Sequence, residues 1–199
     1  MSARRSSGAS RGKAPARGRA KPTAGPRRAK APPRARAAIA PASLGRAGRA
    51  AAERAATELC HEVLARQGVV RAEVGLAFGG DDTLRELNRR YRGLDKATDV
   101  LSFTYEDQSD GRGRRRLAGD VVISVPRIFV QARRYRVSPG RELARLLVHG
   151  ALHLCGHDHL RAGERTRMRG LELAHLQRLG KKREQALTQL LLAWSPSME

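Results

Sequence analysis

Residues His149 to His159 have the sequence His-Gly-Ala-Leu-His-Leu-Cys-Gly-His-Asp-His, with histidines at offsets of zero, four and ten. Residues four apart share one face of a helix, so His149 and His153 are predicted to project side by side. Gly156 can adopt the left-handed conformation that ends a helix, and the chain can then turn back to bring His159 to the same point. We therefore expect a metal site with three imidazole ligands and one position open to water, as in catalytic zinc sites.

The segment before these histidines predicts the helix that carries them. It begins at Ser138 and Pro139, and the histidines lie at the margin of its apolar stripe, which favours a place on the wall of a cleft over a place in the core. The apolar stripe consists of Leu143, Leu146, Leu147, Ala151 and Leu154. Cys155 offers a thiolate as an alternative fourth ligand, but it lies two residues past His153 and points away from that face. We interpret it as a small core residue.

The ligand spacing also matches the zincin pattern HExxHxxGxxH, with one departure. Gly150 stands where the zincin peptidases have the glutamate that acts as general base. A glycine cannot accept a proton. A zincin-like metallopeptidase is therefore an alternative function that the spacing favours and that Gly150 disfavours.

Positive charge dominates the composition of the chain. Its 199 residues include 40 Lys and Arg against 19 Asp and Glu, a formal net charge of +21. This excess favours phosphate-rich partners and salt-dependent binding. Residues 1–45 are mostly Ala, Arg, Pro, Gly, Ser and Lys, which predicts a disordered basic arm because few large apolar side chains offset the entropy of ordering. A solubilising tail, a nonspecific RNA-holding arm and an organellar transit peptide remain open for it.

Residues 46–199 are long enough for a single domain with its own core. Two cysteines, Cys60 and Cys155, do not make a disulfide framework, which is typical of a reducing compartment. No apolar run approaches the length of a membrane span. These features predict a cytoplasmic protein that does not act in a membrane.

Helix-like and strand-like patterns alternate along residues 46–199, which predicts an α+β fold with one small mixed sheet packed with helices, among them the zincin-like metal helix. Asp81 or Asp82 is expected to cap the second helix and Gly93 to end it. The expected elements are a helix over 46–67, a strand over 69–78, a helix up to Gly93, a strand over 98–103, an exposed loop over 105–116, a strand over 117–125, a helix over 126–135, the metal helix, and a helical region over 163–194 broken near Gly180.

Four blocks of sequence, taken in their order along the chain, can be compared with a known family. They are Leu-Asn-Arg-Arg-Tyr-Arg-Gly at 87–93, Asp-Lys-Ala-Thr-Asp-Val-Leu-Ser-Phe at 95–103, Gly-Asp-Val-Val-Ile-Ser at 119–124, and the histidine motif. In this order and spacing they resemble the YbeY family of endoribonucleases and ribosomal RNA maturation factors. The resemblance extends from about Glu53 to Glu172.

The resemblance implies a metal-dependent endoribonuclease specific for single strands, which acts in ribosomal RNA maturation, at the 3′ end of small-subunit RNA, and in ribosome quality control. It implies that His149, His153 and His159 bind zinc and that these histidines and Arg92 form the catalytic site. Another divalent transition metal also suits imidazole ligands. The implied partners are ribosomal RNA and the small ribosomal subunit, with a ribosome-associated GTPase and a small-subunit ribosomal protein as further candidates.

Several residues near the motif have two interpretations. Arg92 can clamp a phosphate or interact with the last carbonyls of its own helix. His157, where the family usually has tyrosine, can compete as a ligand or carry a proton; a metal-activated water and the 2′-hydroxyl of the substrate are the other proton carriers. Asp158 can orient a ligand imidazole or stabilise the turn. Thr104 replaces the usual proline.

A third function to weigh is a non-catalytic ribosome-assembly factor that uses the metal only for folding. The open coordination position predicted for the three-histidine site disfavours it, because structural zinc sites have four protein ligands.

Overall fold

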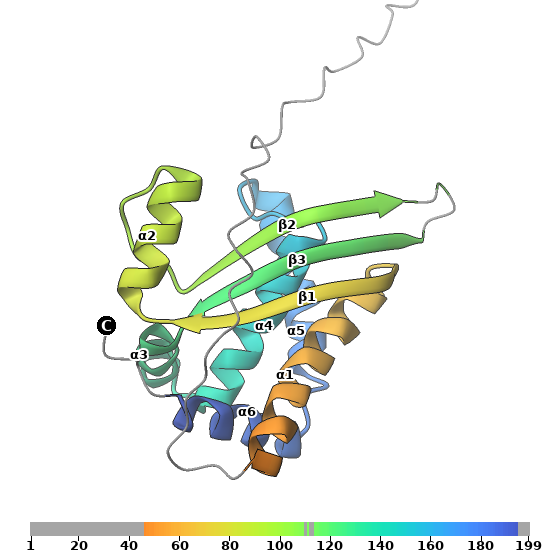
Figure 1. The fold of residues 1–199 in the computed structure, drawn as a ribbon. Coiled ribbons are helices and arrows are strands. Elements are labelled where there is room, and N and C mark those ends of the chain that lie inside the picture. Colours follow the sequence, from red (N-terminus) through yellow and green to blue (C-terminus); the bar gives the residue numbers. More distant parts are fainter. Residues whose placement is uncertain (1–45, 110, 112–113, 195–199) are drawn as a thin grey trace, which may run out of the picture.

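In this computed structural model, the structure describes residues 46–109, 111 and 114–194; the predicted arm over residues 1–45 lies outside them. Within the described part there are six helices and three strands, and four of the helices follow the last strand (Figure 1). The helices are α1 (Arg46–Arg66), α2 (Asp81–Arg92), α3 (Val125–Tyr135), α4 (Pro139–Leu154), α5 (Ala162–Leu176) and α6 (Lys181–Leu192), and the strands are β1 (Val69–Gly79), β2 (Val100–Ser109) and β3 (Arg115–Ser124).

The sheet is small and mixed, with the strand order β1-β3-β2. β1 is parallel to β3, and β2 is antiparallel to β3. As drawn in Figure 1, α1, α4, α5 and α6 lie on one side of the sheet, and α2 lies above one end of its other side. The predicted α+β class with one small mixed sheet is confirmed.

Successive side chains of β3 point to opposite faces of the sheet, so this strand contributes to the packing on both faces. Val121 and Ile123 belong to the main core under the helices, whereas Val122 packs with Leu84 of α2 in a second, smaller cluster. Successive strand residues point to opposite faces, so this result follows from the pleat. Helix α4 is almost wholly buried in the main core, and this fixes the helix that carries the first two histidines.

The exposed loop expected over residues 105–116 is wrong for residues 105–109 and 115–116, while residues 110, 112 and 113 lie outside the described part. β2 continues to Ser109 and β3 begins at Arg115, and these two residues are paired across the ladder. Polar residues suggested a loop, but here they lie on a hairpin whose β2 strand is exposed from Glu106 to Ser109. The Arg115 guanidinium also binds the Asp107 carboxylate across the two strands, so their polar side chains stabilise the pairing.

The helix ends agree with prediction except at the start of α2. Gly93 ends that helix in the left-handed conformation, with a φ of 71°. Its N-cap, however, is Gly80, and Asp81 lies inside the first turn instead of capping it. The Asp81 carboxylate accepts hydrogen bonds from the Ser124 hydroxyl at 2.6 Å and from Arg127 Nε at 3.1 Å, so it joins α2 to the start of α3.

Candidate metal centre

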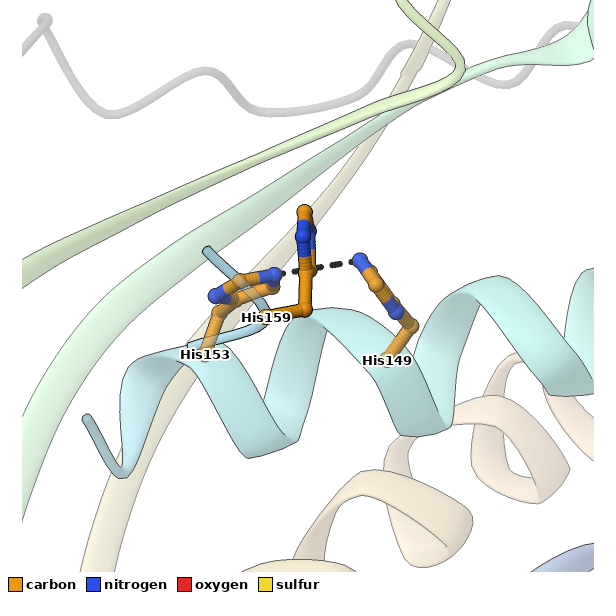
Figure 2. Close-up of side chains that lie close together, drawn as sticks. All are labelled: His149, His153 and His159. Atoms are coloured by element: carbon orange, nitrogen blue, oxygen red, sulfur yellow. Dashed lines mark hydrogen bonds between the residues drawn. The ribbon is translucent and has the colours of Figure 1, made fainter. Parts of the chain in front are cut away.

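Helix α4 and the turn after it bring the three motif histidines together. Ser138 caps α4 by accepting a hydrogen bond from the Arg141 backbone N–H, and Gly156 turns the chain back with a φ of 84°. One nitrogen from each of His149, His153 and His159 lies within 4.8 Å of the others. Figure 2 shows the three rings converging beside α4, with His149 Nε2 and His153 Nε2 3.1 Å apart.

The protonation state of the central ring suits a metal ligand. Burial, together with neighbouring His149 and His159, lowers the pKa of His153 to about 4, so its imidazole is neutral near pH 7. A metal binds the neutral ring through its free nitrogen lone pair. Three convergent imidazoles with a neutral centre therefore fit a divalent transition metal, with nitrogen donors that suit zinc, nickel, copper or iron.

A carboxylate that sequence reasoning did not assign orients the first histidine. Glu172 Oε1 lies 2.6 Å from His149 Nδ1, and both side chains are largely shielded from solvent. With Nδ1 held by the carboxylate, Nε2 is the nitrogen that faces the other two rings. Such an outer carboxylate fixes the tautomer and the ring orientation of a ligand histidine. The helical spacing of Glu172 from Met168 was visible in the sequence, but nothing there indicated contact with His149.

The turn between His153 and His159 is tied to distant parts of the chain. His157 Nε2 lies 2.7 Å from Gln67 Oε1 beyond the end of α1, so His157 is not part of the ligand group. Of the two interpretations open for His157, competition for the metal is therefore not supported. Arg115 donates two hydrogen bonds of 3.3 Å to the Cys155 carbonyl. The Asp158 carboxylate accepts from the His159 backbone N–H at 2.7 Å, as expected for the turn-stabilising role.

Two other residues of the motif face the core. Cys155 is buried and its sulfur is not in the ligand group, as the sequence predicted. Gly150 faces the sheet: a Cβ at this position would lie 2.6 Å from Val121 Cγ1 and 3.2 Å from Ser102 Oγ. A glutamate there would have to displace β3 before it could reach the histidines. Met168 of α5 is also a buried core residue.

The histidines open into a cleft of about 410 Å³ that also contains Arg92. It is lined by Arg92, Thr98, Asp99, Val100, Ser102, His149, His153, Asp158, His159 and Leu160. Arg92 is exposed, and no hydrogen bond or ion pair joins its guanidinium to any residue that the structure describes, the carbonyls of α2 included. It is therefore available to a ligand in the cleft.

Asp99 forms the inner wall of the cleft and is held by polar partners from behind. Gln131 donates to its carboxylate at 3.1 Å, and Arg145 lies 3.5 Å away. Burial raises the pKa of Asp99, but these two partners and its own backbone N–H outweigh burial, so the pKa lies below its ordinary value. Arg145 is held in turn by the buried Glu142 at 2.6 Å. The ionised Asp99 carboxylate is thus held in place by side chains of α3 and α4.

No helix among the described residues has the length and apolar character needed to cross a membrane.

Comparison with known proteins yields one family. The family model described as Endoribonuclease YbeY matches residues 46–180. Proteins named Endoribonuclease YbeY are 48% identical over 112 residues in Desulforamulus reducens (55% of this chain, 73% of the relative) and 47% identical over 118 residues in Chloroflexus aurantiacus (56% and 76%). The solution structure of a Thermotoga maritima protein aligns with a TM-score of 0.43 and 21% identity, over 68% of this chain and 83% of that one. This chain belongs to the YbeY endoribonuclease family.

Proposed function

We propose that this protein is a metal-dependent endoribonuclease, specific for single-stranded RNA, that acts in ribosomal RNA maturation. One observation carries the proposal: the three convergent imidazoles line the same cleft as Arg92, whose guanidinium pairs with none of the described residues. A cation site beside a positive side chain suits a phosphodiester substrate. The name shared by the matched relatives supports the same reaction class.

His149, His153 and His159 would hold the metal, and zinc is the ion we propose, because three neutral imidazoles with an open position are typical of catalytic zinc. When bound, such an ion supplies Lewis acidity toward a phosphoryl oxygen. Glu172 would keep His149 in the tautomer that presents Nε2.

Arg92 would bind the scissile phosphate within the cleft that it lines together with the histidines. Its planar guanidinium can donate two parallel hydrogen bonds to phosphate oxygens and stabilise negative charge that grows in the transition state. The ionised Asp99 on the inner wall repels phosphate and therefore favours a bound strand whose phosphate lies toward Arg92. It can also accept a hydrogen bond from a ribose hydroxyl.

The two alternative functions receive less support. A zincin-like peptidase needs a general base next to the first histidine, and the position of Gly150 faces the sheet instead of the cleft. An assembly factor with a purely structural metal does not require an open, arginine-flanked cleft beside the ligands.

The cellular role is part of the same proposal. We propose processing of the 3′ end of small-subunit ribosomal RNA and ribosome quality control in the cytoplasm, with ribosomal RNA and the small subunit as partners. A ribosome-associated GTPase and a small-subunit ribosomal protein are further proposed partners. The net charge of +21 supports binding to an RNA-rich particle.

The decisive experiment compares His153→Ala with His61→Ala, a matched substitution of an exposed histidine on α1. On precursor ribosomal RNA, we expect His153→Ala to lose cleavage and bound metal while it still binds RNA, and His61→Ala to behave as the parent. Arg92→Ala should lower the cleavage rate about 10²–10³-fold with metal content unchanged.

Three outcomes would contradict the proposal. Unchanged cleavage by His153→Ala would remove the catalytic assignment of the histidines. Hydrolysis of casein without hydrolysis of RNA would favour the peptidase. Binding to ribosomal particles with no cleavage above a metal-stripped control would favour the assembly factor.

A further inference from the structure

We propose that three arginines of α5 and its N-cap, Arg161, Arg165 and Arg169, form a phosphate-binding track that extends the metal cleft along an RNA strand. We call these three residues the arginine track. The inference rests on the proposed function, since it takes RNA as the molecule in the cleft.

The arginine track starts at the edge of the cleft. His159 and Leu160 line the cleft, and α5 follows directly, with Arg161 as its N-cap. Arg165 Nε lies 3.3 Å from the His159 carbonyl, which places that side chain beside the third ligand.

The arginine track lies on the side of α5 that faces the metal centre. Glu172 reaches His149, so its side of α5 faces the metal centre. Arg165 and Arg169 precede Glu172 by seven and three residues, and residues at these spacings share one side of a helix. The arginines therefore continue along α5 from the side on which the histidines lie.

The positive charge of the arginine track is not neutralised within the described part of the chain. All three side chains are exposed and make no ion pair with a described residue. The two acidic residues of α5 are engaged elsewhere: Glu164 accepts from the Arg161 backbone N–H at 3.1 Å, and Glu172 binds His149. Apart from the hydrogen bond of Arg165 Nε to the His159 carbonyl, no described residue occupies these guanidinium groups, so they can bind an anionic ligand.

The position of the charge also argues against a role in helix stability. Arg161 is the N-cap of α5 and Arg165 follows Glu164 near the end of the first turn, where the helix dipole is positive and favours acidic residues. Basic side chains there weaken the helix unless an anion neutralises them. A bound phosphate backbone supplies that anion.

The spacing of the arginine track suits a nucleic acid strand. Residues four apart on a helix lie about 6 Å apart along its axis, and the length of arginine side chains lets each one reach a separate phosphate. Arg92 lines the same cleft. A strand that passes from Arg92 over the histidines to α5 would meet positive charge on both sides of the metal centre. The arginine track is continuous with the cleft that takes RNA in the proposed function, and this favours RNA over an acidic protein segment as its ligand.

The test measures RNA binding by the full chain with cleavage blocked by His153→Ala. The test variant adds Arg161→Gln and Arg169→Gln, and leaves Arg165 because it contacts the His159 carbonyl. The control adds Lys181→Gln and Lys182→Gln, two exposed lysines at the start of α6, and so removes the same charge. Fluorescence anisotropy follows a labelled single-stranded oligoribonucleotide at several salt concentrations.

We expect the arginine variant to raise the Kd for RNA about tenfold, and to make the plot of log K against log salt shallower by roughly 1.4, about 0.7 for each lost phosphate contact. The lysine control should change the Kd by less than about twofold. Equal weakening by both variants would show only general attraction, and unchanged binding by the arginine variant would remove the track. Equally tight binding of polyglutamate would indicate an acidic protein partner instead.

A different experiment, cleavage of RNA by the metal-loaded parent protein, tests the proposed function. If the metal-loaded parent cleaves no RNA, the endoribonuclease proposal is overturned, whereas a tenfold difference in RNA affinity between the two variants would still support the arginine track.

Discussion

At the scale of single residues, the contact between His149 and Glu172 fixes the ring orientation of one histidine in the candidate metal centre. The carboxylate lies 2.6 Å from Nδ1, on the far side of the ring from the nitrogen that faces His153. A ring without this partner can rotate or present the other nitrogen. The carboxylate thus determines which nitrogen of His149 is available as a ligand.

We predict that Glu172→Ala lowers zinc affinity about 10–100-fold, because His149 loses its orienting acceptor. Glu172→Gln keeps an acceptor oxygen and should show a smaller loss. Competition with a chromophoric chelator measures both. Glu58→Ala, on the exposed side of α1, is the control and should bind zinc like the parent. Parent-like affinity in Glu172→Ala would show that the contact does not orient the ligand.

His157 shows why the sequence of the motif left the role of one of its residues open. It lies two positions before a ligand, and its ring suggested a competing donor. In the structure the ring binds Gln67, 90 positions away in the chain. Because local spacing constrains only the backbone of the turn, the direction of this ring depends on where the end of α1 lies.

At the scale of the elements, the approach of α4 to β3 determines which side of the metal helix faces the cleft. The contact is close at Gly150, whose carbonyl also accepts a hydrogen bond from the Ser102 hydroxyl at 3.1 Å. Val121, which a side chain at 150 would meet, is fully buried in the central strand and has little freedom to move. Glycine at this position therefore has a packing reason.

We predict that Gly150→Ala lowers the free energy of unfolding by roughly 1–3 kcal/mol, because the new methyl group overlaps Val121 and this outweighs the better helix propensity of alanine. Urea denaturation measures the change. Gly170→Ala is the matched control: it is exposed on α5 with open space at its Cβ, so it should stabilise the protein by about 0.5–1 kcal/mol. If both variants gained stability, the close packing of α4 on β3 would be refuted.

For the whole molecule, buried histidines make stability depend on pH. Burial is the largest cause that lowers the pKa of His153, His157 and His175 from the ordinary value of 6.5. Below about pH 6.5 the unfolded chain therefore binds more protons than the folded protein. The free energy of unfolding then falls as the pH falls.

We predict that the metal-stripped protein loses stability between about pH 7 and pH 5, and that His175→Gln makes this loss smaller because one depressed histidine is removed. Urea denaturation at several pH values measures both. This range stays above the titration of carboxyl groups such as Glu62, whose pKa is lowered mainly by the hydrogen bond from Arg183. A pH slope unchanged by His175→Gln would contradict the prediction.

Much of the fold could be predicted from the sequence because its causes are local. Apolar periodicity and the glycine stops predicted the helices, and the spacing of the histidines predicted that their rings converge, since the helical repeat and a left-handed Gly156 suffice for that. The hairpin at 105–116 was missed because its polar strand residues are stabilised by pairing with each other, and strand pairing is not a property of either segment alone.

The sequence by itself determined that three imidazoles meet beside a helix, because that arrangement depends on offsets of four and ten residues along one short stretch. Only the tertiary structure decided that Glu172 orients His149, that His157 turns to Gln67, and that Gly150 faces Val121. Each of these contacts joins segments that come together only when α4 is packed between the sheet and the other helices, so no local pattern could reveal them.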